Sequence, residues 1–122
     1  MTIAANFEFF YVQRANGYRK FQFWDHPGNY GLNPVNIFVF QGANVVIYVF
    51  DVTDQMSLTE TINQIKEIRQ DPDCKFDPDC QGYLVGNQID LPREVRRETG
   101  QEAAKELGLK YLEVTATDHE SV

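Results

Sequence analysis

The sequence predicts an α/β fold with a mostly parallel sheet in its last two thirds. The apolar segments Val45–Phe50, Tyr83–Val85 and Tyr111–Val114 are typical of strands, and segments with helical spacing separate them. Strands that alternate with helices are joined by right-handed crossovers and form parallel sheets. The 122 residues are enough for one domain, and because we find no linker we expect a single domain over residues 1–122.

The first part of the chain predicts an antiparallel β-hairpin. Apolar residues alternate over Ile3–Tyr11, and the strand pattern resumes in Tyr18–Asp25 after the turn signal Ala15–Gly17. His26–Asn29 then break the chain, and the irregular stretch that follows contains at most a short helix over Val35–Phe40.

The central strand and the two helices have more specific signals. Val45–Phe50 is apolar without alternation, which is typical of a strand buried on both faces. Capping boxes start both predicted helices, the first at Ser57 and Glu60 and the second at Thr99 and Glu102. The core positions expected for the first helix are Leu58, Ile62, Ile65 and Ile68. We expect the first helix to end before Asp71, and Gly108 occupies the C-cap position of the second helix.

Charge and composition exclude several classes of protein. Eighteen acidic and eleven basic residues give a net charge of −7, which argues against a nucleic acid or an anionic membrane surface as the main partner. The longest apolar run is too short to insert into a membrane, and no segment resembles a secretion signal. Cys74 and Cys80 are too few for a disulfide scaffold, so we expect reduced thiols in a cytoplasmic protein.

An acidic loop over Asp71–Cys80 contains the sequence Asp-Pro-Asp-Cys twice. Its carboxylates and thiols make a metal site conceivable, but mixed Asp and Cys ligands with two prolines match no usual site. We therefore expect a solvated loop and no metal there. His26 and His119 lie far apart in the sequence and do not suggest a catalytic pair.

Polar motifs follow four of the expected strands. In open α/β sheets, ligands bind beyond the carboxyl ends of the strands, so these motifs are candidates for a binding site. In chain order they are Asp25-x-x-Gly28, Asp51, Asn87-x-x-Asp90 and Thr115-Ala116.

These motifs and the residues around them are similar, in order and separation, to those of the small GTPases of the Ras superfamily, nearest to the Rab-like members. The aromatic sequence Trp-Asp-His-Pro-Gly also resembles the Rag branch, so the subfamily stays open. One such motif would be weak, but five in the family's order rarely arise by accident. The matching segments are Thr2–Phe7 (switch I exit), Trp24–Gly28 (switch II entry), Gly42–Ala43 with Val45–Asp54 (central strand), Leu84–Leu91 (base-recognition loop) and Glu113–Ala116 (last loop).

The resemblance implies a P-loop-type G domain that binds GTP or GDP with Mg²⁺. Asp90 would accept hydrogen bonds from guanine N1–H and N2–H₂, a pair of donors that adenine lacks. Asn87 would tie the loop down and reach the base, and the Ala116 N–H would meet guanine O6. An Asn-x-x-Asp after a strand is also compatible with an ordinary Asx turn. The other expected nucleotide-binding residues are Gln88, Thr115 and Thr117.

The resemblance also implies roles near the phosphates and on the surface. Asp25 would hold Mg²⁺ through water, the Thr2 hydroxyl would ligate it, and the Gly28 N–H would touch the γ-phosphate. Phe7 and Trp24 match two positions of the family's effector-contacting aromatic cluster. The simpler alternatives are a strand-ending turn for Asp25 and Gly28, a frayed terminus for Thr2, and core or edge packing for the two aromatic residues.

The largest departure from the family is the lack of a G-x-x-x-x-G-K-[ST] sequence. We therefore expect a partial G domain that lacks the first strand, the phosphate loop, the first helix and the last helix, with an apolar sheet face left bare and weak nucleotide binding alone. Asn29 occupies the position of the water-positioning catalytic Gln, and Gln88 and Thr117 each replace a Lys. No C-terminal prenylation cysteine is present, so we expect no lipidation site in these residues.

The sequence leaves three functions open. The first is a Rab-like GTPase domain, incomplete in these residues, that switches effector and regulator binding in vesicle traffic or signalling. The second is a non-hydrolysing pseudo-GTPase that acts as a protein-interaction module, which the substitutions at Asn29, Gln88 and Thr117 favour. The third, a non-nucleotide α/β binding domain, requires the series of motifs to be accidental.

Overall fold

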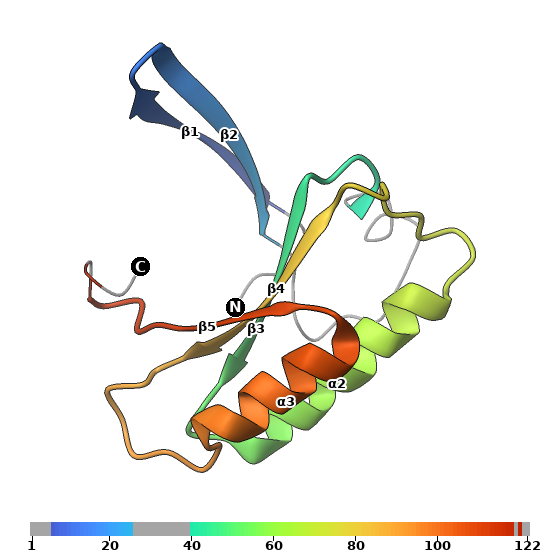
Figure 1. Cartoon of the computed structure of the whole chain (residues 1–122), viewed down its shortest axis with the longest axis vertical. Coiled ribbons are helices and arrows are strands. Elements are labelled where there is room, and N and C mark those ends of the chain that lie inside the picture. The colour runs from blue at the N-terminus through green and yellow to red at the C-terminus, as the bar shows by residue number, and fades with distance from the viewer. Residues whose placement is uncertain (1–5, 26–39, 119, 121–122) are drawn as a thin grey trace.

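Two separate sheets and two helices form the structure, a computed structural model that describes residues 6–25, 40–118 and 120 (Figure 1). The strands β3, β4 and β5 form a parallel sheet in that order, and β1 and β2 form an antiparallel hairpin. The α/β class, the hairpin and the parallel sheet are thus confirmed. The elements are β1 (Asn6–Arg14), β2 (Gly17–Asp25), β3 (Val45–Asp51), α2 (Gln55–Gln70), β4 (Gln81–Asn87), α3 (Arg97–Leu107) and β5 (Lys110–Glu113).

The hairpin β1–β2 extends away from the three-stranded sheet (Figure 1). Its two-residue turn is followed by Gly17, whose φ of 116° is a backbone conformation that residues other than glycine rarely adopt. The strands pair over their full length, from Asn6 opposite Asp25 to Arg14 opposite Gly17. The first residues of the strand expected from Ile3, and the helix expected over Val35–Phe40 apart from Phe40, lie outside the described residues.

The core lies between the parallel sheet and the two helices, which cover the same side of it (Figure 1). Helix α2 packs on β3, and α3 packs on β4 and β5. The helical spacing of the sequence is confirmed, because Leu58, Ile65 and Ile68 are buried and Ile62 is partly buried against the core. The main core cluster consists of Phe50, Val52, Leu58, Ile65, Leu84, Val95 and Ala104.

The prediction that β3 is buried on both faces is wrong. Its exposure alternates, and Val45, Ile47 and Val49 are 47%, 49% and 55% exposed. Phe50 points to the helices and is buried, whereas within the described part of the chain these three valine and isoleucine side chains face solvent. A continuous apolar run therefore does not distinguish a strand covered on two sides from one covered on a single side. These exposures agree with the expectation from the sequence that one apolar face of the sheet is left bare.

Both predicted capping boxes are wrong, because the N-cap of each helix lies three residues earlier, at Asp54 and at Arg96. Helix α2 is capped by Asp54, whose carboxylate accepts a hydrogen bond from Met56 N at 2.9 Å. The hydroxyl of Ser57 instead contacts the backbone of Asp51, where it accepts from the N–H at 2.9 Å. Helix α3 starts after Arg96 without a side-chain cap. The earlier carboxylate of Asp54 lies one turn before Ser57, which leaves the serine inside the helix.

The helix ends follow the sequence more closely. Helix α2 ends at Gln70 before Asp71. Helix α3 ends at Leu107, and the φ of 69° and the backbone hydrogen bonds of Gly108 make it the expected C-cap. No helix within the described residues is both long and apolar enough to cross a membrane.

Candidate functional site

The loop after β4 turns back sharply at Gln88. This residue has φ of 66°, in the left-handed region, which is uncommon for a residue other than glycine, and Leu91 N donates to its carbonyl oxygen at 3.1 Å. The turn exposes Asp90 beside the carboxyl end of the strand, while Asn87 is the last residue of β4.

The loop after β5 contacts this turn through one side-chain hydroxyl and one backbone N–H. The hydroxyl of the buried Thr115 donates to Asp90 Oδ1 at 2.8 Å. The backbone N–H of Ala116 donates to Asn87 Oδ1 at 3.2 Å. The Thr117 hydroxyl lies 3.3 Å from that of Thr115, and because Thr115 gives its one hydrogen to Asp90, Thr117 is the donor. The structure therefore brings these five predicted site residues together.

These contacts differ from those of an ordinary Asx turn at the Asn-x-x-Asp motif. An Asx turn would use the side chains of Asn87 and Asp90 to accept from backbone groups two residues further on. The recorded hydrogen bonds instead join residues 25 and 29 positions apart in the sequence. The motif thus links two loops at one end of the sheet, where ligands of α/β proteins bind.

An ion pair between a partly exposed arginine and a buried carboxylate joins the same two loops. The guanidinium of Arg93 forms a bidentate contact with the Glu113 carboxylate, with one Nη1–Oε1 hydrogen bond of 3.2 Å, and the Tyr111 hydroxyl donates to Glu113 Oε2 at 2.8 Å. The Glu113 side chain is only 4% exposed, and Arg97 lies 3.9 Å from its other oxygen. Because Arg93 follows Asp90 and Glu113 precedes Thr115, the pair fixes the spacing of the loops.

The electrostatics of Glu113 follow from these partners. Burial acts to raise the pKa of its carboxyl, but the hydrogen bonds from Arg93 and Tyr111 and the charges of Arg93 and Arg97 outweigh burial, so the pKa lies below its usual range. Burial, followed by the hydrogen bond to Glu113, raises the pKa of Tyr111. Glu113 is therefore ionised, and Tyr111 is a neutral donor, at neutral pH. Sequence analysis placed Glu113 in the last motif but missed this network.

The segment between Asp90 and α3 is fixed by the backbone of Val52. The carbonyl oxygen of Val52 accepts from Glu94 N at 2.9 Å and from Val95 N at 3.0 Å, and Val95 is buried in the core. The Glu94 carboxylate accepts from Gln55 N at 3.1 Å and so adds a second cap to α2. No pattern in the sequence indicated Glu94, because its partner lies 39 residues away.

The predicted effector residues Phe7 and Trp24 lie opposite each other on the hairpin. Their ring centroids are 5.0 Å apart, and they are 50% and 43% exposed, so neither is a core residue. Asp25 is the last residue of β2. Thr2, Gly28 and Asn29 lie outside the described residues, so their expected roles stay predictions.

Comparison with known proteins identifies the family of this chain. A model of the Ras family matches residues 1–122. The chain belongs to the Ras family. It is 32% identical to the Ras-related protein RIC1 of Oryza sativa subsp. japonica and 30% identical to the Ras-related proteins RABD2a of Arabidopsis thaliana and SEC4 of Candida albicans, over 99% of the chain in each case. It covers 59%, 59% and 57% of these relatives, so the chain spans less than two thirds of their length.

The acidic loop of this Ras-family chain folds as two similar turns. In the first, Asp71 Oδ1 accepts from Asp73 N at 2.8 Å, and Cys74 N donates to the Asp71 carbonyl at 3.2 Å. Asp77 accepts from Asp79 and Cys80 in the same way, at 2.8 and 2.9 Å. The Asp-Pro-Asp-Cys repeat is therefore a repeated turn. Within the described part of the chain no cluster of three or more His, Cys, Asp or Glu residues is placed to hold a metal.

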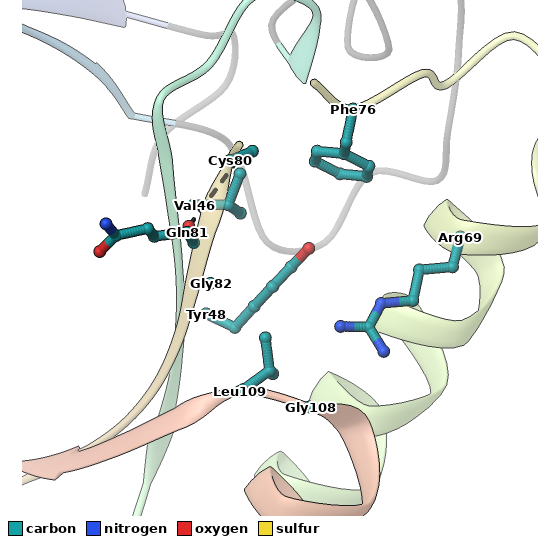
Figure 2. A pocket seen from close by; sticks show the side chains of 9 residues that line it. All are labelled: Val46, Tyr48, Arg69, Phe76, Cys80, Gln81, Gly82, Gly108 and Leu109. Carbon is teal, nitrogen blue, oxygen red and sulfur yellow. Dashed lines mark hydrogen bonds between the residues drawn. The ribbon is translucent and has the colours of Figure 1, made fainter. Parts of the chain in front are cut away.

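A pocket of about 190 Å³ lies at the opposite end of the sheet, beside the starts of β3 and β4 (Figure 2). The Tyr48 side chain extends into it, and its hydroxyl points between Phe76 and Arg69. Burial raises the pKa of Tyr48 to about 12, against the opposing charge of Arg69. This pocket is separate from the loops after β4 and β5, and sequence analysis did not predict it.

Proposed function

We propose that these residues form the guanine-recognition and effector-binding part of a Rab-like small GTPase. The observation that carries the proposal is the pair of contacts from the loop after β5 to Asp90 and Asn87. They hold the Asp90 carboxylate at the carboxyl end of β4, with Oδ2 and the second lone pair of Oδ1 available to the N1–H and N2–H₂ groups of guanine. Ala116 N would exchange the Asn87 oxygen for guanine O6.

The proposal extends to Mg²⁺ and to the phosphates only in outline. Asp25 has the carboxylate that Mg²⁺ prefers, and with Thr2 it would hold the ion, while Gly28 would contact the γ-phosphate. When bound, Mg²⁺ would neutralise phosphate charge during transfer. Since these residues contain no phosphate-loop sequence, we expect weak nucleotide binding by them alone. A role in vesicle traffic or signalling in the cytoplasm completes the proposal.

A test of base recognition uses amide NMR spectra of the 122-residue chain with Mg²⁺. We expect millimolar GDP to shift the Ala116 and Gln88 amide signals and ADP to shift them far less. Asp90→Ala should reduce the GDP affinity about tenfold or more, which corresponds to about 1.4 kcal/mol. Asp79→Ala, an exposed carboxylate in the acidic loop, is the matched control. Equal shifts with GDP and ADP, or none at these loops, would contradict the proposal.

A second candidate function is a non-hydrolysing interaction module. Three substitutions relative to the family pattern favour it: Asn29, Gln88 and Thr117. Thr117 uses its hydroxyl within the loop, as a donor to Thr115, and has no long stem to pack over a base. GTP hydrolysis by the whole protein, measured as phosphate release with Mg²⁺, distinguishes the two. No phosphate release by the wild-type protein, and none by the Asn29→Gln variant, would support the module.

A further inference from the structure

The pocket beside the starts of β3 and β4 combines apolar walls with one cation (Figure 2). The apolar walls come from the side chains of Val46, Tyr48, Phe76 and Leu109, and the cation is Arg69 at the end of α2. A cavity of about 150 Å³ is enough to hold benzene. The volume of about 190 Å³ therefore admits one aromatic ring with a short substituent.

Two glycines contribute to the space in this pocket. Gly108 has the left-handed backbone conformation that ends α3, and no heavy atom lies within 4 Å of the position that its Cβ would take. A Cβ on Gly82 would overlap the side chain of Leu109, so this position of β4 also favours glycine. The space is thus a consequence of the backbone at the end of α3 and of the packing of Leu109 on β4.

Two hydrogen-bond donors in this pocket have no partner among the described residues. The Tyr48 hydroxyl points between Phe76 and Arg69 (Figure 2). Within the part of the chain that the structure describes, neither this hydroxyl nor the Arg69 guanidinium makes a hydrogen bond or an ion pair, and both ion pairs there involve Glu113. A buried tyrosine hydroxyl usually finds a partner, and a guanidinium can offer two parallel N–H donors to a carboxylate. The two groups are therefore available to one acceptor in the pocket.

The charges around the Tyr48 hydroxyl favour an anionic acceptor. Arg69 is the one cation among the described lining residues, and none of them is an aspartate or a glutamate. The acidic loop borders the pocket, but the side chains of Asp71 and Asp77 accept hydrogen bonds from the backbone of their own turns. Because burial raises the pKa of Tyr48 to about 12, its hydroxyl keeps its proton at neutral pH and stays a donor.

We propose that this pocket binds a small aromatic carboxylate. Its ring would contact Val46, Phe76 and Leu109, and its carboxylate would accept from the Tyr48 hydroxyl and pair with Arg69. A neutral hydrocarbon would leave both donors without a partner, and an inorganic anion would leave the apolar walls uncovered. The pocket lies at the opposite end of the sheet from the loops after β4 and β5, so this site is separate from the proposed guanine recognition.

The first test compares phenylacetate with phenylacetamide, which has nearly the same shape and no charge. Amide NMR spectra of the 122-residue chain follow the signals of Gly82 and Gly108. We expect phenylacetate to shift them in a saturable way at millimolar concentration, which is ordinary for a ligand of about ten non-hydrogen atoms. Phenylacetamide should bind at least fivefold more weakly, and acetate more weakly still. Equal affinities for the acid and the amide, or no saturable shift with phenylacetate, would overturn the proposal.

The second test changes the two donors one at a time. We expect Arg69→Gln and Tyr48→Phe each to weaken phenylacetate binding about fivefold, the value of one net hydrogen bond, and to change phenylacetamide binding less than twofold. Lys66→Gln is the matched control, because it removes the same charge from an exposed position of α2 that does not line the pocket. Equal effects of Arg69→Gln and Lys66→Gln would show that net charge acts without regard to the pocket, which contradicts the proposal.

A third variant fills the pocket. Val46→Phe adds a ring to its wall, and we expect phenylacetate binding to be lost while the dispersion of the amide spectrum shows that the chain is folded. Undiminished binding by the folded variant would place the ligand elsewhere and overturn the proposal. The GDP-dependent shifts of Ala116 are recorded on the same samples. If phenylacetate binds without any GDP response, the proposed guanine recognition fails and this inference does not; if GDP alone binds, the reverse holds.

Discussion

The guanidinium of Arg93 and the carboxylate of Glu113 form a bidentate ion pair that joins the two loops of the candidate guanine site. Glu113 is 4% exposed and Arg93 33% exposed, so the carboxylate is the buried partner. A buried carboxylate that loses its partner stays desolvated without compensation. The pair therefore couples the stability of the fold to the geometry of Asp90 and Thr115.

Replacement of Arg93 by Ala is expected to destabilise the chain by about 2 kcal/mol, which is less than for a fully buried ion pair because Arg93 is partly exposed. Urea denaturation followed by circular dichroism measures the change. Arg97→Ala is the matched control, because Arg97 is 62% exposed and 3.9 Å from Glu113, and we expect it to cost less than about 1 kcal/mol. Similar costs for the two variants would show that Arg93 is not the main partner.

The lowered pKa of Glu113 predicts a dependence of stability on pH. The ion pair contributes its full stabilisation above the unfolded-state pKa of about 4.3, and this contribution is lost as the pH falls through the lower folded-state pKa. The difference in unfolding free energy between the wild-type chain and Glu113→Gln should therefore shrink below about pH 4.3. Glu102→Gln, on the exposed side of α3, should change stability by less than about 0.5 kcal/mol at neutral pH. A difference for Glu113→Gln that does not vary with pH contradicts the assignment.

Close packing of α3 on β5 predicts the effect of a methyl group at Gly100. A Cβ there would overlap the ring and hydroxyl of Tyr111, so either the tyrosine side chain, which donates to Glu113, or the helix would have to shift. We expect Gly100→Ala to destabilise the chain by about 1–3 kcal/mol, although alanine favours helices. Gln101→Ala, one exposed position along α3, should be neutral or stabilising in the same thermal melts. A Gly100→Ala chain that is more stable than the wild type would show that the structure around Tyr111 accommodates the methyl group without cost.

The hydroxyl of Thr115 is expected to orient Asp90 for guanine. Thr115→Val removes the 2.8 Å hydrogen bond while the side chain keeps its size, and we expect GDP binding to weaken about fivefold, or about 1 kcal/mol. Thr115→Ser keeps the hydroxyl and should bind GDP nearly as the wild-type chain does. The NMR titration of the Ala116 amide measures both. Equal affinities for the Val and Ser variants would exclude an orienting role.

The two cysteines are expected to differ in reactivity. Cys74 is 6% exposed and packs against Ile68, whereas Cys80 is partly exposed. Burial, and then the neighbouring carboxylate of Asp71 or Asp77, raises the pKa of each thiol, so both should react more slowly at pH 8 than a free thiol does. Timed alkylation and mass spectrometry should show Cys80 modified first, with equal rates in denaturant. Faster modification of Cys74 in the folded chain would contradict this packing.

The sequence predicted well those features that depend on neighbouring residues. The hairpin itself, the helical spacing of Leu58 and Ile65, and Gly108 at the end of α3 depend on signals over a few positions, and each is confirmed. The capping boxes failed although they are also local, because Asp54 offers a competing cap to the first helix. The roles of Thr2, Gly28 and Asn29 stay predictions.

The sequence by itself determined the α/β class, the order of the motifs and, through that order, membership of the Ras family. Only the tertiary structure decided that Thr115 holds Asp90, that Arg93 pairs with Glu113, and that one face of β3 is exposed. The first two contacts span 25 and 20 residues and depend on the parallel register of β4 and β5. The third depends on which side of the sheet α2 and α3 cover, and an apolar strand is compatible with either arrangement.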